Sequence, residues 1–287
     1  MIGEIYQDLR FCFRSLFRRP SAAIVAAVVA MAIGIGAAVA IFSVVKTVLL
    51  QPLPYPNADR AVTVWNQFIQ LDLPQVQLSE PELYEYVERS QSLQALAAFV
   101  VGQGNLTGVD DPERVDYAAV SPQLFSILGV KASQGRVFVE GEDRPDAPRI
   151  IVLSDAFWRR RQGADPNAVG RDMYVNGNRY TIIGIMPPGF RFPEKIDLWL
   201  PLRLDPANPG MRGNHYLEAL GQLKPGVTLS QAQAELDVIA QQLQKEFPMS
   251  YPADSGWGVN LIPLYEDMTG EVRPALLIFL AAVGLVL

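Results

Sequence analysis

The feature that most constrains this chain is an apolar run from Ala22 to Val45, in which no residue carries a charge. As a helix rising about 1.5 Å per residue, a run of this length can cross a bilayer core about 30 Å thick. A helix in the core of a soluble protein rarely needs so long an apolar stretch. We therefore predict a transmembrane helix over residues 21–46.

Small residues recur at every fourth position of this run, beginning at Ala22. A stripe of small residues lets two membrane helices approach each other closely. We predict that Ala26, Ala30, Gly34 and Ala38 pack against another helix in the membrane. The alternative interpretation is that an alanine-rich helix shows this spacing by chance.

The segment before the run is basic and amphipathic. Four arginines against Glu4 and Asp8 give residues 1–21 a net charge of +2. Because the whole chain has a net charge of −6, the residues after position 21 have a net charge of −8. The positive-inside rule predicts a cytoplasmic N-terminus in the cell inner membrane and an extracytoplasmic domain after the helix. Residues 1–20 place their apolar side chains on one helical face, which predicts a helix lying in the lipid interface. The acidic remainder argues against nucleic acid as a partner.

Two alternatives concern this first segment. A cleaved signal peptide fits its basic start and the small residues from Ala38 to Ala40, but the apolar part of a signal normally spans only about 7–15 residues. Cys12, the single cysteine, could carry a lipid, although a small buried hydrophobe is the simpler interpretation. The outer domain has no cysteine and must be held together without disulfides.

Residues 47–273 have the pattern of an outer domain. Prolines at alternating positions, Pro52, Pro54 and Pro56, predict an extended exit from the membrane. Alternating or continuous apolar runs predict strands over residues 61–68, 98–106, 114–120, 150–153, 172–175, 180–185, 198–202, 215–223 and 257–264. Helices are predicted to begin at Ser79, Pro122, Ser154 and Ser230, the first continuing as far as Leu96.

These elements predict an α+β fold. Breaks rich in proline and glycine place an inserted β-rich subdomain at about 129–212, within an α/β, porter-like subdomain built from about 60–128 and 213–268. Residues 274–287 are apolar and too few to cross a bilayer, so we expect them to begin a second transmembrane helix in a chain that is a fragment of a longer one.

Residues able to carry chemistry are few. The single histidine, His215, excludes a histidine-rich metal site and is interpreted as structural. No nucleotide-binding glycine motif occurs, so no cofactor is predicted. Two charged clusters are interpreted as solvated surface: the acidic loop of Glu140, Glu142 and Asp143, which lacks calcium-loop spacing, and the run of arginines at residues 159–161. The sequence predicts no catalytic, cofactor or metal site and no enzyme.

Three stretches resemble a known family. They are LFSILGVKASQGRVFVEGED at residues 124–143, the run from IIVLSDAFWRRRQG to PPGFRFP at residues 150–193, and LKPGVTLSQAQAELDVIAQQL at residues 223–243. With the preceding amphipathic helix, span and PLPY exit, the chain is similar to the first part of MacB-type permeases of ABC transporters, the group that includes FtsX-like permeases. The likeness is greatest to large permeases that carry two copies of the membrane and core unit.

The resemblance implies a periplasmic core domain of two subdomains, four membrane helices per unit, an ABC ATPase in a separate chain or fused, and a second permease unit in a dimer or pseudo-dimer. It implies a permease subunit of an efflux system that couples ATP hydrolysis to motion of the outer domain. The alternative is a membrane-anchored binding or sensor module without an ATPase; an anchored hydrolase fits the residues poorly. Neither the transported substrate nor the identity of the ATPase follows from the sequence.

Overall fold

The computed structural model describes residues 22–46, 53–108, 112–270 and 272–286. These residues form two compact units, an apolar helix pair and an outer unit spanning Leu53–Asp267. The interfacial helix predicted over residues 1–20, together with Cys12, lies outside the described residues.

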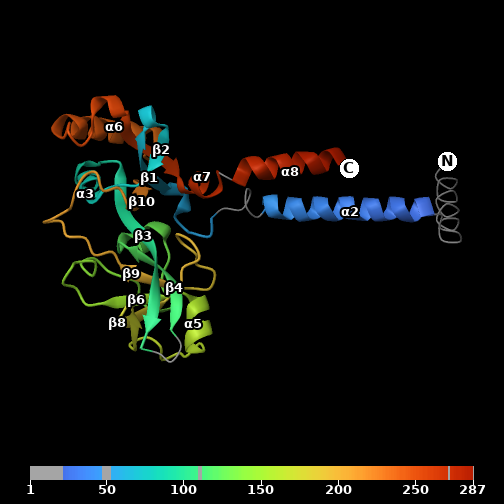
Figure 1. Cartoon of the computed structure of the whole chain (residues 1–287), viewed down its shortest axis with the longest axis horizontal. Coiled ribbons are helices and arrows are strands. Elements are labelled where there is room, and N and C mark those ends of the chain that lie inside the picture. Colours follow the sequence, from blue (N-terminus) through green and yellow to red (C-terminus); the bar gives the residue numbers. More distant parts are fainter. Residues whose placement is uncertain (1–21, 47–52, 109–111, 271, 287) are drawn as a thin grey trace. The chain divides into compact units, whose positions relative to one another are not determined.

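The helix pair consists of α2 (Ala22–Val45) and α8 (Val272–Val286), which lie side by side (Figure 1). Helix α2 contains no charged residue, and α8 contains one, Arg273 in its first turn. A helix bonds the backbone groups between its ends within itself, as a bilayer requires. Among the described helices, α2 contains the one window long and apolar enough to cross a membrane, Val28–Val45, with a mean hydropathy of 2.6.

The outer unit is built on one mixed sheet, whose main path runs in the order β11-β1-β10-β3-β4-β9-β6-β8-β5, with β2 paired to β1 and β7 paired to β3 and β8. The strands are β1 (Ala61–Phe68), β2 (Leu73–Val76), β3 (Leu93–Thr107), β4 (Glu113–Val120), β5 (Gln134–Gly135), β6 (Ile150–Leu153), β7 (Asp172–Val175), β8 (Asn178–Ile185), β9 (Leu198–Pro201), β10 (Glu218–Leu223) and β11 (Trp257–Pro263). Most neighbours are antiparallel, whereas β4–β9 and β6–β8 are parallel.

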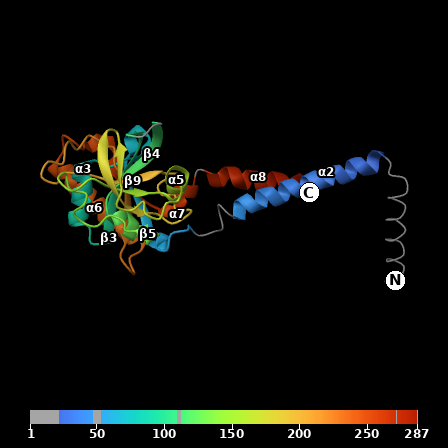
Figure 2. The same ribbon diagram turned by 90° about the horizontal axis from the view of Figure 1, so that it is seen from below.

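Five α-helices accompany the sheet: α3 (Glu80–Arg89), α4 (Gln123–Leu128), α5 (Asp155–Gln162), α6 (Leu229–Glu246) and α7 (Leu264–Thr269). Single turns of 3-10 helix occur at Ala58–Arg60, Ile69–Leu71 and Ala253–Ser255. Helices α3 and α6 contact each other and lie together at one side of the outer unit (Figure 2). Local signals explain several boundaries, for example the Ser154 hydroxyl that accepts from the Phe157 N–H at the start of α5.

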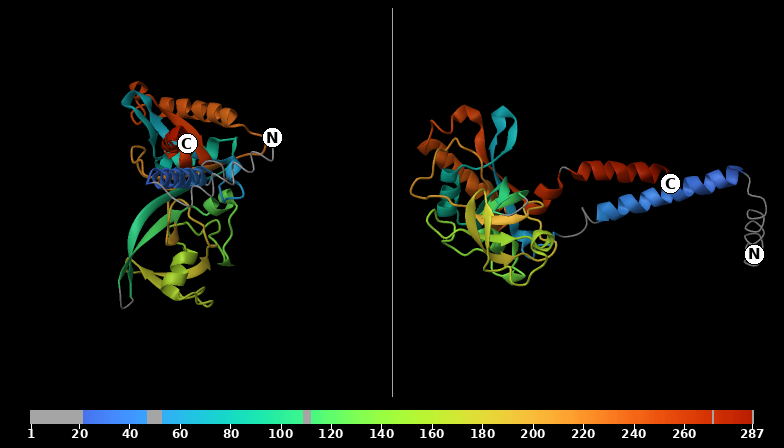
Figure 3. Two further views of the ribbon diagram at one scale, coloured as in Figure 1. Left: turned by 90° about the vertical axis from the view of Figure 1, so that its right-hand side faces the viewer. Right: turned by 60° about the horizontal axis from the view of Figure 1, so that its bottom comes forward.

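The longest strand, β3, links two parts of the outer unit. It starts beside α3 and α6 and runs with β4 toward the part that holds α5 (Figures 1 and 3). Its first residues pack with the α3–α6 core, whereas Leu106 packs with Ile151, Phe157 and other residues of the predicted insertion. The strands of the predicted insertion at 129–212 therefore belong to the same sheet as the strands of the flanking pieces. The boundaries of the insertion stay a prediction.

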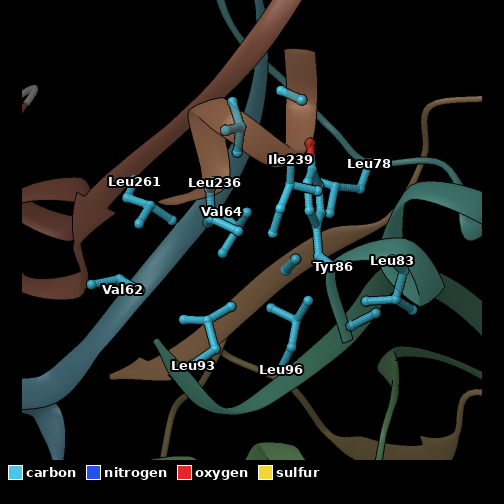
Figure 4. Packing of buried hydrophobic residues seen from close by; sticks show 14 of the residues in the cluster. Val62, Val64, Leu78, Leu83, Tyr86, Leu93, Leu96, Leu236, Ile239 and Leu261 are labelled. Atoms are coloured by element: carbon cyan, nitrogen blue, oxygen red, sulfur yellow. The ribbon is translucent and has the colours of Figure 1, made fainter. Parts of the chain in front are cut away.

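The core under α3 and α6 contains the inward-facing side chains of β1, β3 and both helices. Val64, Leu96, Leu83 and Ile239, each from a different element, point toward one another (Figure 4). Alternate apolar residues on the strands and residues three or four apart on the helices produce this face. The sequence predicted both periodicities.

The outer edge of the sheet is closed by a side chain of α6. On β11, the Val259 carbonyl accepts from Gln233 Nε2 at 2.9 Å, and the Leu261 N–H donates to Gln233 Oε1 at 2.8 Å. Both backbone groups point away from β1, because neighbouring residues of a strand bond on opposite sides. The amide of Gln233 thus takes the place of a further strand.

Two predicted boundaries are wrong. The helix from Ser79 ends at Arg89, and Leu96 lies in β3, because the turn after α3 is held from α6. The N–H groups of Gln91 and Ser92 donate to the Glu235 carboxylate at 2.5 and 2.9 Å, which fixes the chain in a turn. The strand predicted from residue 215 begins instead at Glu218.

Other predictions are confirmed. The hairpin of β7 and β8 turns at Asn176–Gly177, both with positive φ, as an Asn-Gly turn requires. Helix α4 ends at Gly129, which adopts the left-handed conformation. The fold is α+β, a mixed sheet domain that follows an apolar helix.

Candidate functional site

The described residues offer little reactive chemistry. They contain no group of three or more histidine, cysteine, aspartate or glutamate side chains that could hold a metal ion. His215 lies with its Nε2 3.3 Å from Oε1 of Glu82, a fully buried carboxylate. The other oxygen of Glu82 accepts from the Ser79 N–H and from Asn66 Nδ2, both at 2.7 Å. His215 therefore belongs to a buried polar cluster that ties residue 215 to α3.

The acidic loop is held by an arginine. Arg136 donates to both oxygens of Glu142 at 2.8 and 2.6 Å, and the Val139 N–H donates to the same carboxylate. These hydrogen bonds, opposed by burial, lower the pKa of Glu142. The hydrogen bonds of the Glu142 carboxylate are thus formed with residues of its own loop.

Each of the consecutive arginines of α5 lies beside an acidic side chain, and Arg161 shares Glu113 with Arg160, at 3.8 Å from its Oε2. Arg159 pairs with Asp155 one turn earlier, whereas Arg160 bridges Glu113 and Asp197 at 2.8 and 3.2 Å. Arg160 therefore joins α5 to β4 and to the start of β9. The three guanidinium groups do not converge on one anion site.

The residues predicted to pack in the membrane lie on α2. Gly34 and Ala38 are half-buried, and the same face continues through Ile41 to the buried Val45, which matches contact with α8. Ala26 and Ala30, nearer the start of α2, are exposed. The stripe of four small residues as a packing surface stays a prediction.

Residues near both ends of the outer unit are buried in one hydrophobic cluster. Tyr55, shortly after α2 in the sequence, and Leu264, shortly before α8, are buried in it at 6% and 1% exposure. Burial raises the pKa of Tyr55 to about 12, so the phenol stays neutral. We call this the anchor cluster; its other buried members include Phe99, Phe125, Phe138, Phe190, Phe192 and Trp199.

Two aromatic side chains of the anchor cluster, Phe190 and Phe192, come from the PPGFRFP loop. Tyr55 meets Phe190 and Phe192 edge-on, with ring centroids 6.0 and 5.9 Å apart. Trp199 packs on Phe190 at 5.2 Å and donates from its Nε1 to the Phe192 carbonyl at 3.0 Å. Edge-to-face geometry is favourable for aromatic pairs and fixes ring orientation.

Helix α7 is also bonded to the sheet. Asp267 Oδ1 accepts from Trp65 Nε1 at 3.2 Å and from Gln75 Nε2 at 3.3 Å, so α7 is tied to β1 and β2. Leu264 and Tyr55 are therefore both held in a packed part of the outer unit.

The sequence did not predict the anchor cluster. The signal present was proline on both sides of aromatic residues, in LPYP at residues 53–56 and in PPGFRFP. Proline restricts the backbone but does not indicate which distant ring an aromatic side chain will meet. The pairing of Tyr55 with Phe190 needs the tertiary structure.

Known proteins share the architecture of the outer unit. The family model of the MacB-like periplasmic core domain matches residues 24–239. The periplasmic region of MacB from Actinobacillus actinomycetemcomitans aligns with a TM-score of 0.54 and 14% identity, over 75% of this chain and 94% of that one. No curated protein matches the chain significantly.

Two further solved structures are similar. A domain of a putative permease protein from Porphyromonas gingivalis gives a TM-score of 0.56 and 18% identity, covering 73% of this chain and 93% of that one. The extracellular domain of the noncanonic ABC-type transporter YknZ from Gram-positive bacteria gives 0.51 and 11%, covering 70% and 99%. At these identities the likeness shows the fold.

Proposed function

Since the chain belongs to the family of MacB-like periplasmic core domains, we propose that it is a permease subunit of an ABC-type extrusion system. Its outer unit is a membrane-anchored extracytoplasmic domain of a permease family. We further propose an inner-membrane location with a cytoplasmic N-terminus, which the arginines before α2 support. The anchored alternative, a binding module without an ATPase, is the competing function.

The observation that carries the proposal is the anchor cluster. A binding module needs only a tether, whereas the outer unit buries side chains from both connections, Tyr55 and Leu264, in one cluster. In the proposed mechanism a partner ATPase closes in the cytoplasm, membrane helices shift as rigid rods, and the anchor cluster passes that shift to the sheet. A second permease unit supplies the surface against which the outer unit moves.

The orientation is tested with cysteine labelling in inverted and right-side-out membrane vesicles. With Cys12 replaced by alanine, Gln7→Cys, off the apolar face of the predicted interfacial helix, should react with a membrane-impermeant maleimide only in inverted vesicles. In a Cys12→Ala background, Asp254→Cys on the surface of the outer unit should react only in right-side-out vesicles. The reverse labelling pattern would contradict the orientation.

The coupling is tested by crosslinking in native membranes, followed by purification of the full chain and measurement of vanadate-sensitive ATP hydrolysis. We expect hydrolysis to copurify, and ATP with vanadate to change the tryptophan fluorescence of the outer unit, where all four tryptophans lie. Tyr55→Ala should leave the hydrolysis and abolish the fluorescence change. Folded chain without copurifying hydrolysis would favour the anchored binding module.

A further inference from the structure

One strand of the sheet stops before its neighbours do. β4 lies between β3 and β9, and its register ends at Val120, opposite Phe99 and Pro201. One more pair of hydrogen bonds follows: the Ser121 N–H donates to the Ala98 carbonyl at 2.9 Å, and Ser121 Oγ accepts from the Ala98 N–H at 3.1 Å. The chain then turns into α4, although β3 extends further in that direction.

The first part of β3 consequently has a strand on one side only, namely β10. Backbone groups alternate sides along a strand, and those of Ala98 face Ser121. Those of Leu96 therefore face the same side, away from β10. Within the part of the chain that the structure describes, no residue forms a hydrogen bond with the Leu96 backbone on that side. This stretch of β3 is an open sheet edge.

A cavity of about 500 Å³ lies along the open edge. Residues 94–96 line it, and so do Leu202 and Leu204, which follow β9 in the chain. Because β3 and β9 are both neighbours of β4, the space left where β4 ends is about two strand spacings, or roughly 9.5 Å, across. Leu83 and Val87 of α3 add apolar surface, and Figure 4 shows Leu83 next to Leu96. A gap of two strand spacings has room for one added strand.

The charge around the cavity is mainly negative. Glu140 and Asp143 line it, and Arg144 is the one cationic side chain among the described lining residues. Burial raises the pKa of Tyr84, another lining residue, to about 12, and the carboxylates of Glu80, Asp143 and Asp205 contribute to the rise. Such surroundings favour a ligand that carries positive charge.

We propose that this cavity, the β3 slot, binds an extended peptide segment with apolar side chains and at least one basic side chain, as an added strand beside Leu96. The main chain of the peptide bonds the open edge, and its apolar side chains pack on α3 and on Leu202 and Leu204. Addition of a strand to an open edge is a recurring mode of peptide recognition. The inference goes beyond the proposed permease function and does not depend on an ATPase.

The test uses the full chain in detergent and a capped, fluorescent pentapeptide of alternating valine and lysine. We expect saturable binding in fluorescence anisotropy, and hydrogen exchange at the Leu96 amide slowed about tenfold or more at saturation, because that N–H gains a partner. The same peptide methylated on alternate backbone nitrogens should bind about tenfold more weakly. Equal binding of the methylated peptide, or unchanged exchange at Leu96, would overturn the proposal.

The charge contribution is tested with Glu140→Lys combined with Asp143→Lys. Both positions lie in a surface loop, and the double variant should weaken binding of the lysine peptide about fivefold to tenfold. The matched control is Asp254→Lys, an exposed position that does not line the slot, and it should bind as the unchanged protein does. If the unchanged protein bound a valine–glutamate peptide more strongly than the valine–lysine peptide, the role proposed for Glu140 and Asp143 would be contradicted.

Discussion

The helix pair and the outer unit place their large apolar side chains in opposite environments. On α2, Phe42 and Ile33 are 56% and 66% exposed, whereas in the outer unit Trp199 and Phe157 are fully buried. The same chain thus contains one region that buries its large apolar side chains and one that exposes them. The outer unit excludes water from its own core, and α2 presents most of its apolar groups outward, as a helix does when its surroundings are apolar too.

The comparison predicts that equal chemical changes have unequal effects in the two regions. Trp199→Ala removes a buried ring and the hydrogen bond to the Phe192 carbonyl, and should cost about 3–5 kcal/mol of unfolding free energy. Phe42→Ala on α2 should cost less than about 1 kcal/mol. Urea unfolding of the full chain in detergent, followed by the fluorescence of the remaining tryptophans, measures both. Similar losses would end the distinction between the regions.

Glycine-to-alanine substitutions compare how much room the two regions leave for an added methyl group. A Cβ on Gly184 in β8 would lie 2.1 Å from the Arg136 carbonyl oxygen, where β5 crosses closely, so Gly184→Ala should cost about 2 kcal/mol or more. Gly36→Ala on α2 meets nothing within 4 Å and should change stability by less than about 0.5 kcal/mol. Gly213→Ala, also in open space, is the control within the outer unit.

The buried polar cluster is a feature that α2, an uncharged helix, does not share. Glu82→Gln leaves one oxygen that can accept from the Ser79 N–H and Asn66, but an amide oxygen is a weaker acceptor than a carboxylate oxygen, so the change should cost about 1–3 kcal/mol. Glu88→Gln, an exposed position on the same helix, should have no measurable effect on the urea midpoint. Equal midpoints for the two variants would show that the cluster does not stabilise α3.

The smallest expected effect concerns pH. Burial opposes ionisation of Glu235, but hydrogen bonds from the Ser92 hydroxyl and from the Gln91 and Ser92 N–H groups lower its pKa below the usual 4.5. A carboxylate whose pKa is lower when folded stabilises the fold above pH 4.5 and loses that contribution as pH falls further. The side chain is partly solvated, so we expect no more than about 1 kcal/mol. Glu235→Gln should remove this part of the acid sensitivity; identical pH profiles would contradict it.

Local elements were predictable because their signals are local. The strand Ala61–Phe68 and the Asn176–Gly177 turn follow from residues that lie next to one another in the sequence. The end of α3 was not predictable, since Glu235, far along the chain, holds the turn at residues 90–92. The anchor cluster and the β3 slot depend on which strands become neighbours, and a single sequence contains no direct signal for that order.

Gln233 occupies backbone groups of the edge strand β11, whereas the stretch of β3 at Leu96 is left open. A second polypeptide that collided with β11 would have to displace an amide already bonded to Val259 and Leu261, whereas at Leu96 it would meet unoccupied backbone groups. On a membrane, where copies of a protein are confined to two dimensions and meet often, an unprotected outer strand would invite end-to-end polymerisation of the outer units. One glutamine on α6 leaves β11 without a free backbone group at the Val259 carbonyl and the Leu261 N–H, the two points where such growth would begin.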